Sequence, residues 1–230
     1  MTGIHQTVLS NFKGSTAPSS GLTVLSATRN TLTQSGTTYS ATVPLGTAVT
    51  NRRVYTFIMS QTTNNGANFD PSGVTLGGTS PAGSSIISQG PQFSVFNYAT
   101  GTSALFQCTF TSTLLSAAQV FVVSVSGHSG AAASSTVYTA GMSTSMSGGN
   151  TTALAVTVDG FIFAGVELEL AKTMTWSSSL GNTMVGIDST SSNIAHCAYS
   201  IVTTGGSDVV SWSGGNPSCA GGKYVTFYSK

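Results

Sequence analysis

Short apolar runs separated by clusters of small polar residues recur along the whole chain. The runs are rich in Val, Ile, Thr, Tyr and Phe, and the clusters consist of Gly, Ser, Asn and Pro. Apolar residues at helical spacing are almost absent. This pattern is typical of β-strands joined by turns, and it predicts an all-β protein.

The pattern places strands from residue 22 to the end of the chain. The predicted strands are 22–27, 37–43, 52–61, 73–77, 84–88, 93–98, 103–112, 118–126, 135–140, 153–158, 160–170, 173–177, 183–187, 194–203, 207–213 and 222–228. Many short strands, with no helices to cover a sheet, favour two sheets packed face to face. We therefore expect an antiparallel two-sheet sandwich, jelly-roll-like, with an N-terminal arm.

Alternation of side chains is clearest in the run FIFAGVELEL. Its even-numbered residues share one face, which we expect to point into the core. The opposite face begins with Phe161 and Phe163 and ends with Glu167 and Glu169. Two aromatic side chains on an outward face predict an apolar contact between subunits. Strand 52–61 is apolar on both faces, which predicts burial on both sides or at a subunit contact.

The first fifty residues are more polar and less regular than the rest. We expect residues 1–21 to form a docking arm, 22–50 an extended or edge-strand segment, and 51–230 the β-sandwich domain. The apolar residues of the arm are Ile4, Val8, Leu9 and Phe12. The arm is too short to fold alone, so it either docks onto a partner or packs on its own domain. We find no internal repeat in the sequence.

Charge is scarce: 6% of residues are charged and the net charge is +1, whereas roughly a quarter are charged in an average soluble protein. Arg52 and Arg53 form the only adjacent basic pair, so nucleic acid is not an expected partner. No apolar run approaches the roughly twenty residues that cross a bilayer, and the N-terminus lacks the pattern of a secretory signal. We expect no membrane insertion.

The three cysteines match no zinc or redox spacing. Cys108 and Cys197 share strand parity with aromatic and aliphatic neighbours, which predicts thiols buried in the core. Cys219 lies in a segment rich in turn residues and is expected to be exposed. An unpaired loop thiol and a contact between subunits are the alternatives for Cys219.

Ser129, in the sequence Gly-His-Ser-Gly, is the first candidate for nucleophilic catalysis. A nucleophile elbow needs Gly-x-Ser-x-Gly followed by a helix. Here the fifth position is Ala131, and the following residues return to a β-like pattern. His128 is adjacent in sequence and therefore badly placed to accept a proton from Ser129. A turn is the favoured interpretation.

The carboxylates and histidines offer little chemistry. Glu167 and Glu169 share a strand face, so a glycosidase acid–base pair, a calcium ligand pair and a solvated or intersubunit face are the alternatives, and we favour the last. His196 has no other metal-ligand type beside it, and we expect a hydrogen-bonded surface or interface histidine. We expect no catalytic residue, no metal site, no cofactor and no enzymatic activity.

The opening MTGIHQTVLSNF, the run AQVFVVSVSG and the closing YVTFYSK lie in a chain rich in Ser, Thr and Gly. In these features the sequence resembles small virion proteins of tailed bacteriophages. The resemblance implies a non-enzymatic protein on the exterior of the particle, as head decoration, a fibre or a tail-associated module. It implies other capsid or tail proteins as partners and a homo-oligomer, with a trimer favoured.

The alternative function, from a different class of protein, is that of a carbohydrate-binding module. Its sugar-stacking residues would be the aromatic side chains near the C-terminus, namely Trp176, Trp212, Tyr224 and Tyr228. A receptor-binding virion protein that contacts a host surface glycan would satisfy both descriptions.

Overall fold

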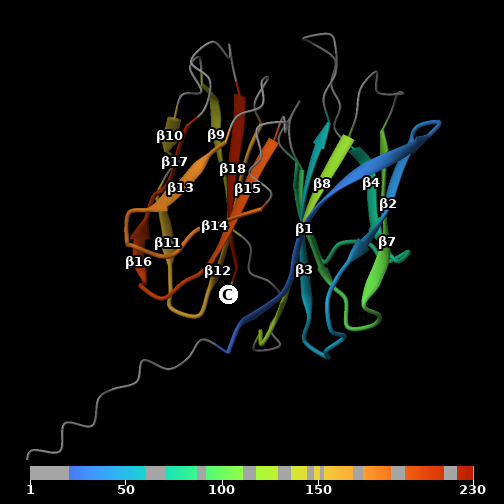
Figure 1. Cartoon of the computed structure of the whole chain (residues 1–230), viewed down its shortest axis with the longest axis horizontal. Helices are drawn as coiled ribbons and strands as arrows, with labels where there is room; N and C mark the ends of the chain where they lie inside the picture. The colour runs from blue at the N-terminus through green and yellow to red at the C-terminus, as the bar shows by residue number, and fades with distance from the viewer. Residues whose placement is uncertain are drawn as a thin grey trace, which may run out of the picture.

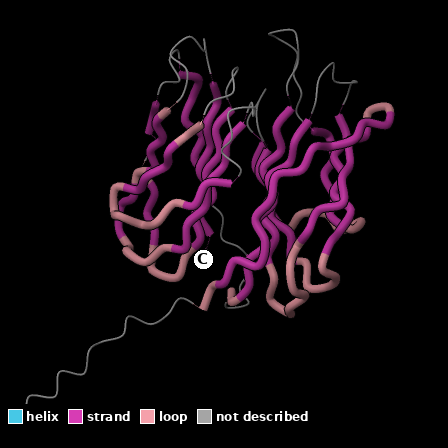
Figure 2. The backbone as a smooth tube through the Cα atoms, in the orientation of Figure 1, coloured by secondary structure: helices cyan, strands magenta, loops and turns pink. Residues whose placement is uncertain are grey.

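The computed structural model describes residues 21–60, 71–86, 92–110, 118–128, 136–143, 148–150, 153–167, 173–187, 195–214 and 222–229. Every regular element in these ranges is a β-strand (Figure 2). Every strand pairing between them is antiparallel. No helix in the described part is long and apolar enough to cross a membrane. The prediction of an antiparallel, jelly-roll-like β-sandwich is confirmed.

The strands fall into two groups along the chain (Figure 1). The first group is β1 (Thr23–Ser35), β2 (Thr38–Pro44), β3 (Arg53–Ser60), β4 (Pro71–Leu76), β5 (Gly83–Ile86), β6 (Gln92–Asn97), β7 (Ser103–Phe110) and β8 (Ala118–Ser126). The second group is β9 (Thr136–Ser143), β10 (Gly148–Asn150), β11 (Leu154–Val156), β12 (Phe161–Glu167), β13 (Thr175–Ser178), β14 (Val185–Ile187), β15 (Ala195–Ile201), β16 (Gly206–Asp208), β17 (Val210–Ser213) and β18 (Gly222–Ser229).

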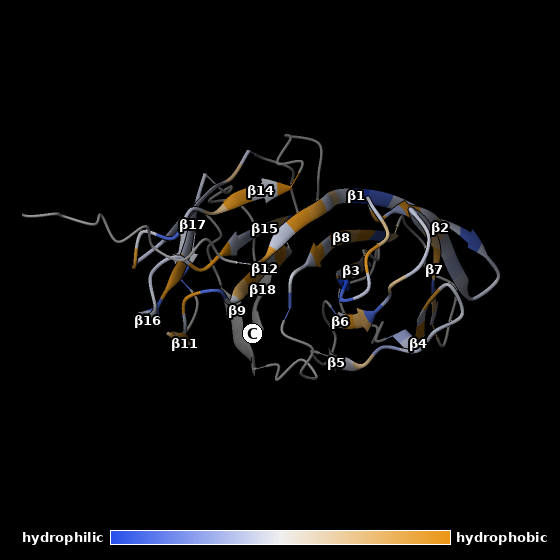
Figure 3. Cartoon of the chain, turned by 90° about the horizontal axis from the view of Figure 1, so that it is seen from below, coloured by the Kyte–Doolittle hydropathy of each residue, from blue (hydrophilic) through white to orange (hydrophobic). Residues whose placement is uncertain are grey.

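The first group forms one sheet in the order β4-β7-β2-β1-β8-β3-β6-β5. Strand β1 is long enough to pair with β8 along Thr23–Leu32 and then with β2 along Thr33–Ser35. The sheet therefore turns over on itself and encloses an interior (Figure 3). The pairings β1·β8, β2·β7 and β3·β6 are those of a jelly roll, in which a long antiparallel ribbon is rolled up.

The second group repeats these strand pairings except β1·β2, and its strands form three sheets, in the orders β14-β15-β12-β18-β9, β10-β17-β13 and β11-β16. Two series of pairings match in order. In the first group they are β1·β8, β2·β7, β3·β8, β3·β6, β4·β7 and β5·β6. In the second group they are β9·β18, β10·β17, β12·β18, β12·β15, β13·β17 and β14·β15. The remaining pairing, β11·β16, continues the β10·β17 ladder after a one-residue shift, from Asn150↔Ser211 to Leu154↔Asp208. The chain is thus two jelly rolls in tandem, called here the first roll (β1–β8) and the second roll (β9–β18).

This organisation differs from the expected domain division at its second boundary. Segment 22–50 contains β1 and β2, and β1 pairs with β8 over Thr23–Leu32 but with β2 only over Thr33–Ser35, so most of β1 has a partner strand on one side only. The division between the two repeated units falls between β8 and β9, that is, between Ser126 and Thr136. It does not fall at residue 51, because β1 and β2 are integral strands of the first roll.

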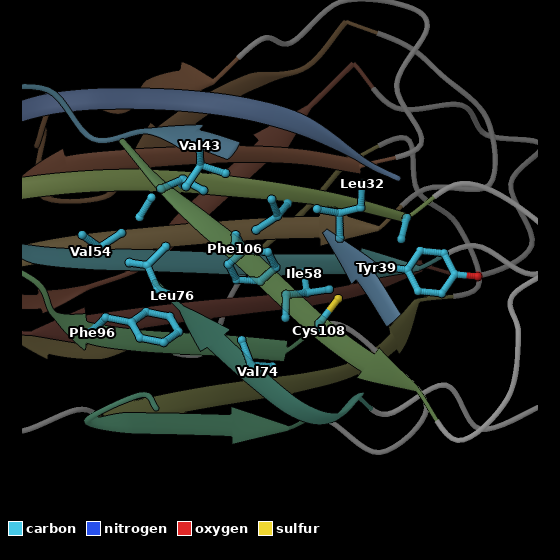
Figure 4. Packing of buried hydrophobic residues seen from close by; sticks show 14 of the residues in the cluster. Leu32, Tyr39, Val43, Val54, Ile58, Val74, Leu76, Phe96, Phe106 and Cys108 are labelled. Atoms are coloured by element: carbon cyan, nitrogen blue, oxygen red, sulfur yellow. The ribbon is translucent and has the colours of Figure 1, made fainter. Parts of the chain in front are cut away.

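Four buried apolar clusters lie among the described residues. The first roll has its own core, which includes Val54, Leu76 and Phe106 (Figure 4). The second roll has two, one around Ile162 and Val210 and one of Val166, Met174 and Trp212. The fourth cluster, called here the junction core, lies between the rolls and consists of Leu22, Tyr55, Phe57, Phe93, Val95, Phe121, Val123, Val125, Phe161, Phe163, Ile187, Ala195 and Cys197.

Several strands are consequently buried on both faces. In β3, Val54 and Ile58 point into the core of the first roll, whereas Tyr55 and Phe57 point into the junction core. This arrangement is the physical reason for the doubly apolar pattern of residues 52–61, because each face of the strand has an apolar layer against it.

Candidate functional site

The junction core fixes the two rolls to each other through aromatic side chains. Phe93 of β6 meets Phe163 of β12 edge to face, with ring centroids 5.2 Å apart and planes at 87°. Tyr55 of β3 lies 4.5 Å from the ring of Phe161. At Gly165 a Cβ atom would lie 2.7 Å from the ring of Phe57, so the two sheets approach closely only because glycine stands there. Such interlocked packing joins the rolls into one unit.

Phe161 and Phe163 lie inside the molecule and not on an outward face. Both side chains are 0% exposed within the single chain. The face of β12 that carries them is covered by β3 and β6 of the same molecule, as their ring contacts with Tyr55 and Phe93 show. The expectation of an outward aromatic face was wrong because the layer that covers it is the first roll, which the sequence did not separate from the second.

A polar cluster lies against the junction core, where Arg53, Tyr55 and His128 meet. Nη1 of Arg53 donates to Nδ1 of His128 over 3.2 Å, and Nε2 of His128 lies 3.0 Å from the hydroxyl oxygen of Tyr55. A guanidinium has no acceptor, so Nδ1 carries no proton, and the neutral ring holds its proton on Nε2 and donates it to Tyr55. Burial, and then the positive charge of Arg53, lower the pKa of His128 to about 4.

Both ring nitrogens of His128 are engaged in this cluster, so the imidazole has no lone pair directed at a substrate. The side chain is 4% exposed, and Arg53 is 3% exposed. General-base catalysis requires an accessible acceptor nitrogen. The cluster therefore supplies a structural link beside the junction core, in agreement with the sequence argument against His128 as a base.

A second polar cluster surrounds Asp208 in the second roll. Its carboxylate accepts hydrogen bonds from Oγ of Ser178 at 2.8 and 2.7 Å, Oγ of Ser179 at 3.1 Å, the backbone N–H of Leu180 at 3.3 Å and Nδ2 of Asn182 at 2.9 Å. Burial raises the pKa of Asp208, but these donors outweigh it, and the net direction is downward. No pattern in the sequence predicted this cluster, because the donors lie far from Asp208 along the chain.

Asn182 extends this cluster to a neighbouring turn. Its Oδ1 accepts from the backbone N–H groups of Thr203 and Thr204, each at 2.9 Å, and its Nδ2 donates to the carbonyl of Thr204 at 3.1 Å. The turn after β13 is thereby tied to the turn before β16. Among the described residues these partners are hydroxyls, amides and one carboxylate, so the cluster holds loops in place and contains no proton acceptor of the histidine type.

Arg52 forms a third internal link, at one end of the first roll. The residue is 1% exposed, and its guanidinium donates to six backbone carbonyls. The acceptors are those of Leu45, Gly46, Thr47, Tyr98, Thr100 and Gly101. Two loops that are distant in sequence are joined by one side chain. Burial lowers the pKa of Arg52.

The proposed sugar-stacking residues are mostly inside the second roll or outside the described side chains. Trp212 is 3% exposed and belongs to a buried cluster with Val166 and Met174. Trp176 is partly buried, with its ring centroid 6.1 Å from that of Trp212. Trp212 is therefore unavailable for stacking on a sugar. The backbones of Tyr224 and Tyr228 lie in β18, and their side chains are outside the described part.

The core thiols are placed as predicted, and His196 is not. Cys108 and Cys197 are 1% and 0% exposed, and burial raises the pKa of Cys108 to about 12. His196 is 0% exposed. It alternates with Cys197, which faces the junction core, so it points into the second roll. The surface or interface position expected for it was wrong because β15 is covered on both faces of the sheet.

Other candidates fall outside the described residues or side chains. They are Ile4, Val8, Leu9, Phe12, Ser129, Glu167, Glu169 and Cys219. Within the described part of the chain, no group of three or more His, Cys, Asp and Glu side chains is placed to hold a metal ion.

Comparison with known proteins adds little. No family model matches the sequence, and no curated protein matches it. Among solved structures, the chain is similar to one described as VP54 of PBCV-1, from a crystal structure fitted into a cryo-EM reconstruction of the virophage Sputnik. The TM-score is 0.25 at 6% identity, and the alignment covers 95% of each chain. A TM-score this low does not establish a common fold.

Proposed function

We propose that this chain is a non-enzymatic structural protein of a virus particle. The observation that carries the proposal is the pair of jelly rolls with matching topology, joined face to face through the junction core. Jelly rolls recur in viral capsid and lectin domains, but a fold alone does not fix a function. Here the polar clusters around His128, Asp208 and Arg52 all serve internal links, which favours a structural role for the described part of the chain.

The finer proposal places the protein on the exterior of a tailed-phage particle, as a homo-oligomer with a trimer favoured. It rests on the resemblance of the sequence to small phage virion proteins and on its low charge. Few ionic side chains reduce the repulsion and desolvation that oppose close packing of neighbouring copies. The residues proposed to dock onto the particle are 4–12 of the arm.

Quantitative mass spectrometry of purified particles, with antibody labelling in negative-stain images, tests the proposal. We expect the protein in fixed stoichiometry with the major particle proteins and label on the outer surface. Absence of the protein from particles would contradict a virion role. Specific binding on a glycan array, lost in Trp176→Ala, would in that case support the carbohydrate-binding alternative.

A truncation tests the docking arm separately. Deletion of residues 1–14 should abolish loading onto particles while circular dichroism and the thermal unfolding temperature stay those of the full chain. Full occupancy of the truncated protein would contradict the role of the arm and leave the virion role standing.

A further inference from the structure

A row of polar side chains points into the apolar interior of the first roll. On strands β3, β6 and β8, the even-numbered residues Val54, Phe96 and Val122 belong to the first-roll core. Side chains alternate along a strand, so the other even-numbered residues of these strands point into the same interior. Four of these are polar and between 0% and 4% exposed: Thr56, Gln92, Ser94 and Ser124.

Three of the four side chains have a buried polar atom without a hydrogen-bond partner. These atoms are Oε1 of Gln92 and the hydroxyl oxygens of Ser94 and Ser124. The hydroxyl of Thr56 donates to the carbonyl oxygen of Ser94 at 3.4 Å. Buried polar groups in native proteins almost always have a partner, either protein or ordered water. The row therefore requires a partner that the described part of the chain does not provide.

Strand register places these groups around Thr56. Ser94 is directly opposite Thr56 on β6, and Gln92 is its diagonal neighbour because Gln92 pairs with Ile58. On the other side, Ser124 pairs with Val54 on β8, which makes it a second diagonal neighbour of Thr56. Direct and diagonal neighbours on one sheet face lie roughly 5 to 8 Å apart, a separation that one hydrogen-bonded water molecule can bridge.

We propose that the first roll binds ordered water molecules at this row, called here the buried polar row (Thr56, Gln92, Ser94 and Ser124). One molecule cannot serve the whole row, because Ser94 and Ser124 lie on strands separated by β3, roughly 9 to 10 Å apart. At least two sites follow, one bonded to Gln92 and Ser94 and one bonded to Ser124, with Thr56 between them.

The chemistry of the row selects water over other occupants. The unpartnered atoms are one amide oxygen and two hydroxyls, which a small neutral donor and acceptor satisfies. No charged side chain belongs to the row, so an ion would have no counter-charge there. An apolar guest would leave the same polar atoms without partners.

Alanine substitutions distinguish hydroxyls that are bonded to water from hydroxyls without any partner, because the two cases change the unfolding temperature in opposite directions. If water satisfies the hydroxyls, Ser94→Ala and Ser124→Ala each remove hydrogen bonds, and the unfolding temperature falls by about 2–4 °C. If the hydroxyls are unpaired, the same changes relieve a desolvation penalty and raise the unfolding temperature. Ser103→Ala, at an exposed position of β7 in the same roll, is the matched control and should leave the unfolding temperature unchanged.

A crystal structure that resolves ordered water gives the direct readout. We expect density within about 3 Å of the hydroxyl oxygens of Ser94 and Ser124, with the first lost in Ser94→Ala and the second in Ser124→Ala. Dry packing around both hydroxyls, together with a raised unfolding temperature in both variants, would overturn the proposal.

Discussion

Arg52 and Arg53 are neighbours in sequence but are stabilised in different ways. Arg52 donates to six backbone carbonyls, and Arg53 donates to a neutral histidine. A buried cation is tolerated only when its hydrogen-bonding groups are satisfied. The planar fork of arginine suits this role, because it presents five N–H donors in fixed directions.

Replacing Arg52 should destabilise the first roll strongly. In Arg52→Met the carbonyls of two loops lose a charged donor, and we expect the free energy of unfolding to fall by about 3 kcal/mol or more. Arg52→Lys should retain only a minor part of the free energy that Arg52→Met loses, because an ammonium group cannot reach both loops. Urea denaturation measures both variants, and equal stability of Arg52→Lys and wild type would contradict this account.

His128 should make stability depend on pH in a defined window. Its pKa is about 4 in the folded protein against an ordinary value of 6.5. The unfolded state therefore binds the proton more readily than the folded state. The contribution of neutral His128 to the free energy of unfolding is complete above pH 6.5 and is lost as the pH falls toward 4. The loss should reach roughly 3 kcal/mol. Urea denaturation at a series of pH values measures it.

His128→Gln is the control for this window, because its side chain remains neutral throughout. Its unfolding free energy should change less than that of wild type between pH 6.5 and 4. Asp208 does not account for a change in this pH range. Its pKa is lowered from 3.8, so its contribution to the free energy of unfolding is lost only at lower pH than that of His128. Parallel pH profiles for wild type and His128→Gln would show that another group is responsible.

At the scale of elements, strands β3 and β12 determine how the layers stack. Each has one face in the core of its own roll and one in the junction core. Gly165 on β12 lets the sheets approach, with the ring of Phe57 in the space that a Cβ would occupy.

A methyl group at residue 165 should therefore disturb the packing of the two rolls. We expect Gly165→Ala to lower the free energy of unfolding by about 1–3 kcal/mol through overpacking. Gly73→Ala on β4 is the matched control, because nothing lies within 4 Å of its Cβ position. Equal stability of the two variants in denaturant would contradict the close approach of the sheets at this glycine.

The sequence predicted most strands but not the layers that cover them. Alternation and β-branched content locate a strand such as β8, whose predicted and observed bounds are both 118–126. Alternation also gives the two faces of β12 correctly, but it cannot say whether the aromatic face meets solvent, another copy or another part of the chain. The links made by Arg52 and Asp208 were missed because their partners are mostly backbone groups or small hydroxyls, and many of them are distant in sequence.

At the scale of the whole molecule, the two rolls share a topology without a visible sequence repeat. The first-roll core uses residues such as Phe96 and Phe106, whereas the second uses smaller side chains and the pair Trp176 and Trp212. Interiors tolerate different apolar residues if volume and pattern are kept. A shared order of strand pairing can therefore persist while residue-by-residue similarity is absent.

The junction core should make the two rolls unfold together. We expect Phe163→Ala to cost about 3–5 kcal/mol and to lower one calorimetric transition that includes both rolls. Hydrogen exchange should show reduced protection on β3 and β6 of the first roll as well as on β12 and β15. Two separate transitions, with the first roll unaffected, would mean that the rolls are independent domains.

The central claim is that the aromatic face of β12 packs against the first roll of the same chain. The most direct test is the nuclear Overhauser effect between the rings of Phe93 and Phe163, measured in a sample with labelled phenylalanine and again after mixing with unlabelled protein. The account predicts a cross-peak that arises within one molecule, since the ring centroids are 5.2 Å apart. A cross-peak seen only between labelled and unlabelled chains would contradict it and restore a subunit contact at Phe161 and Phe163.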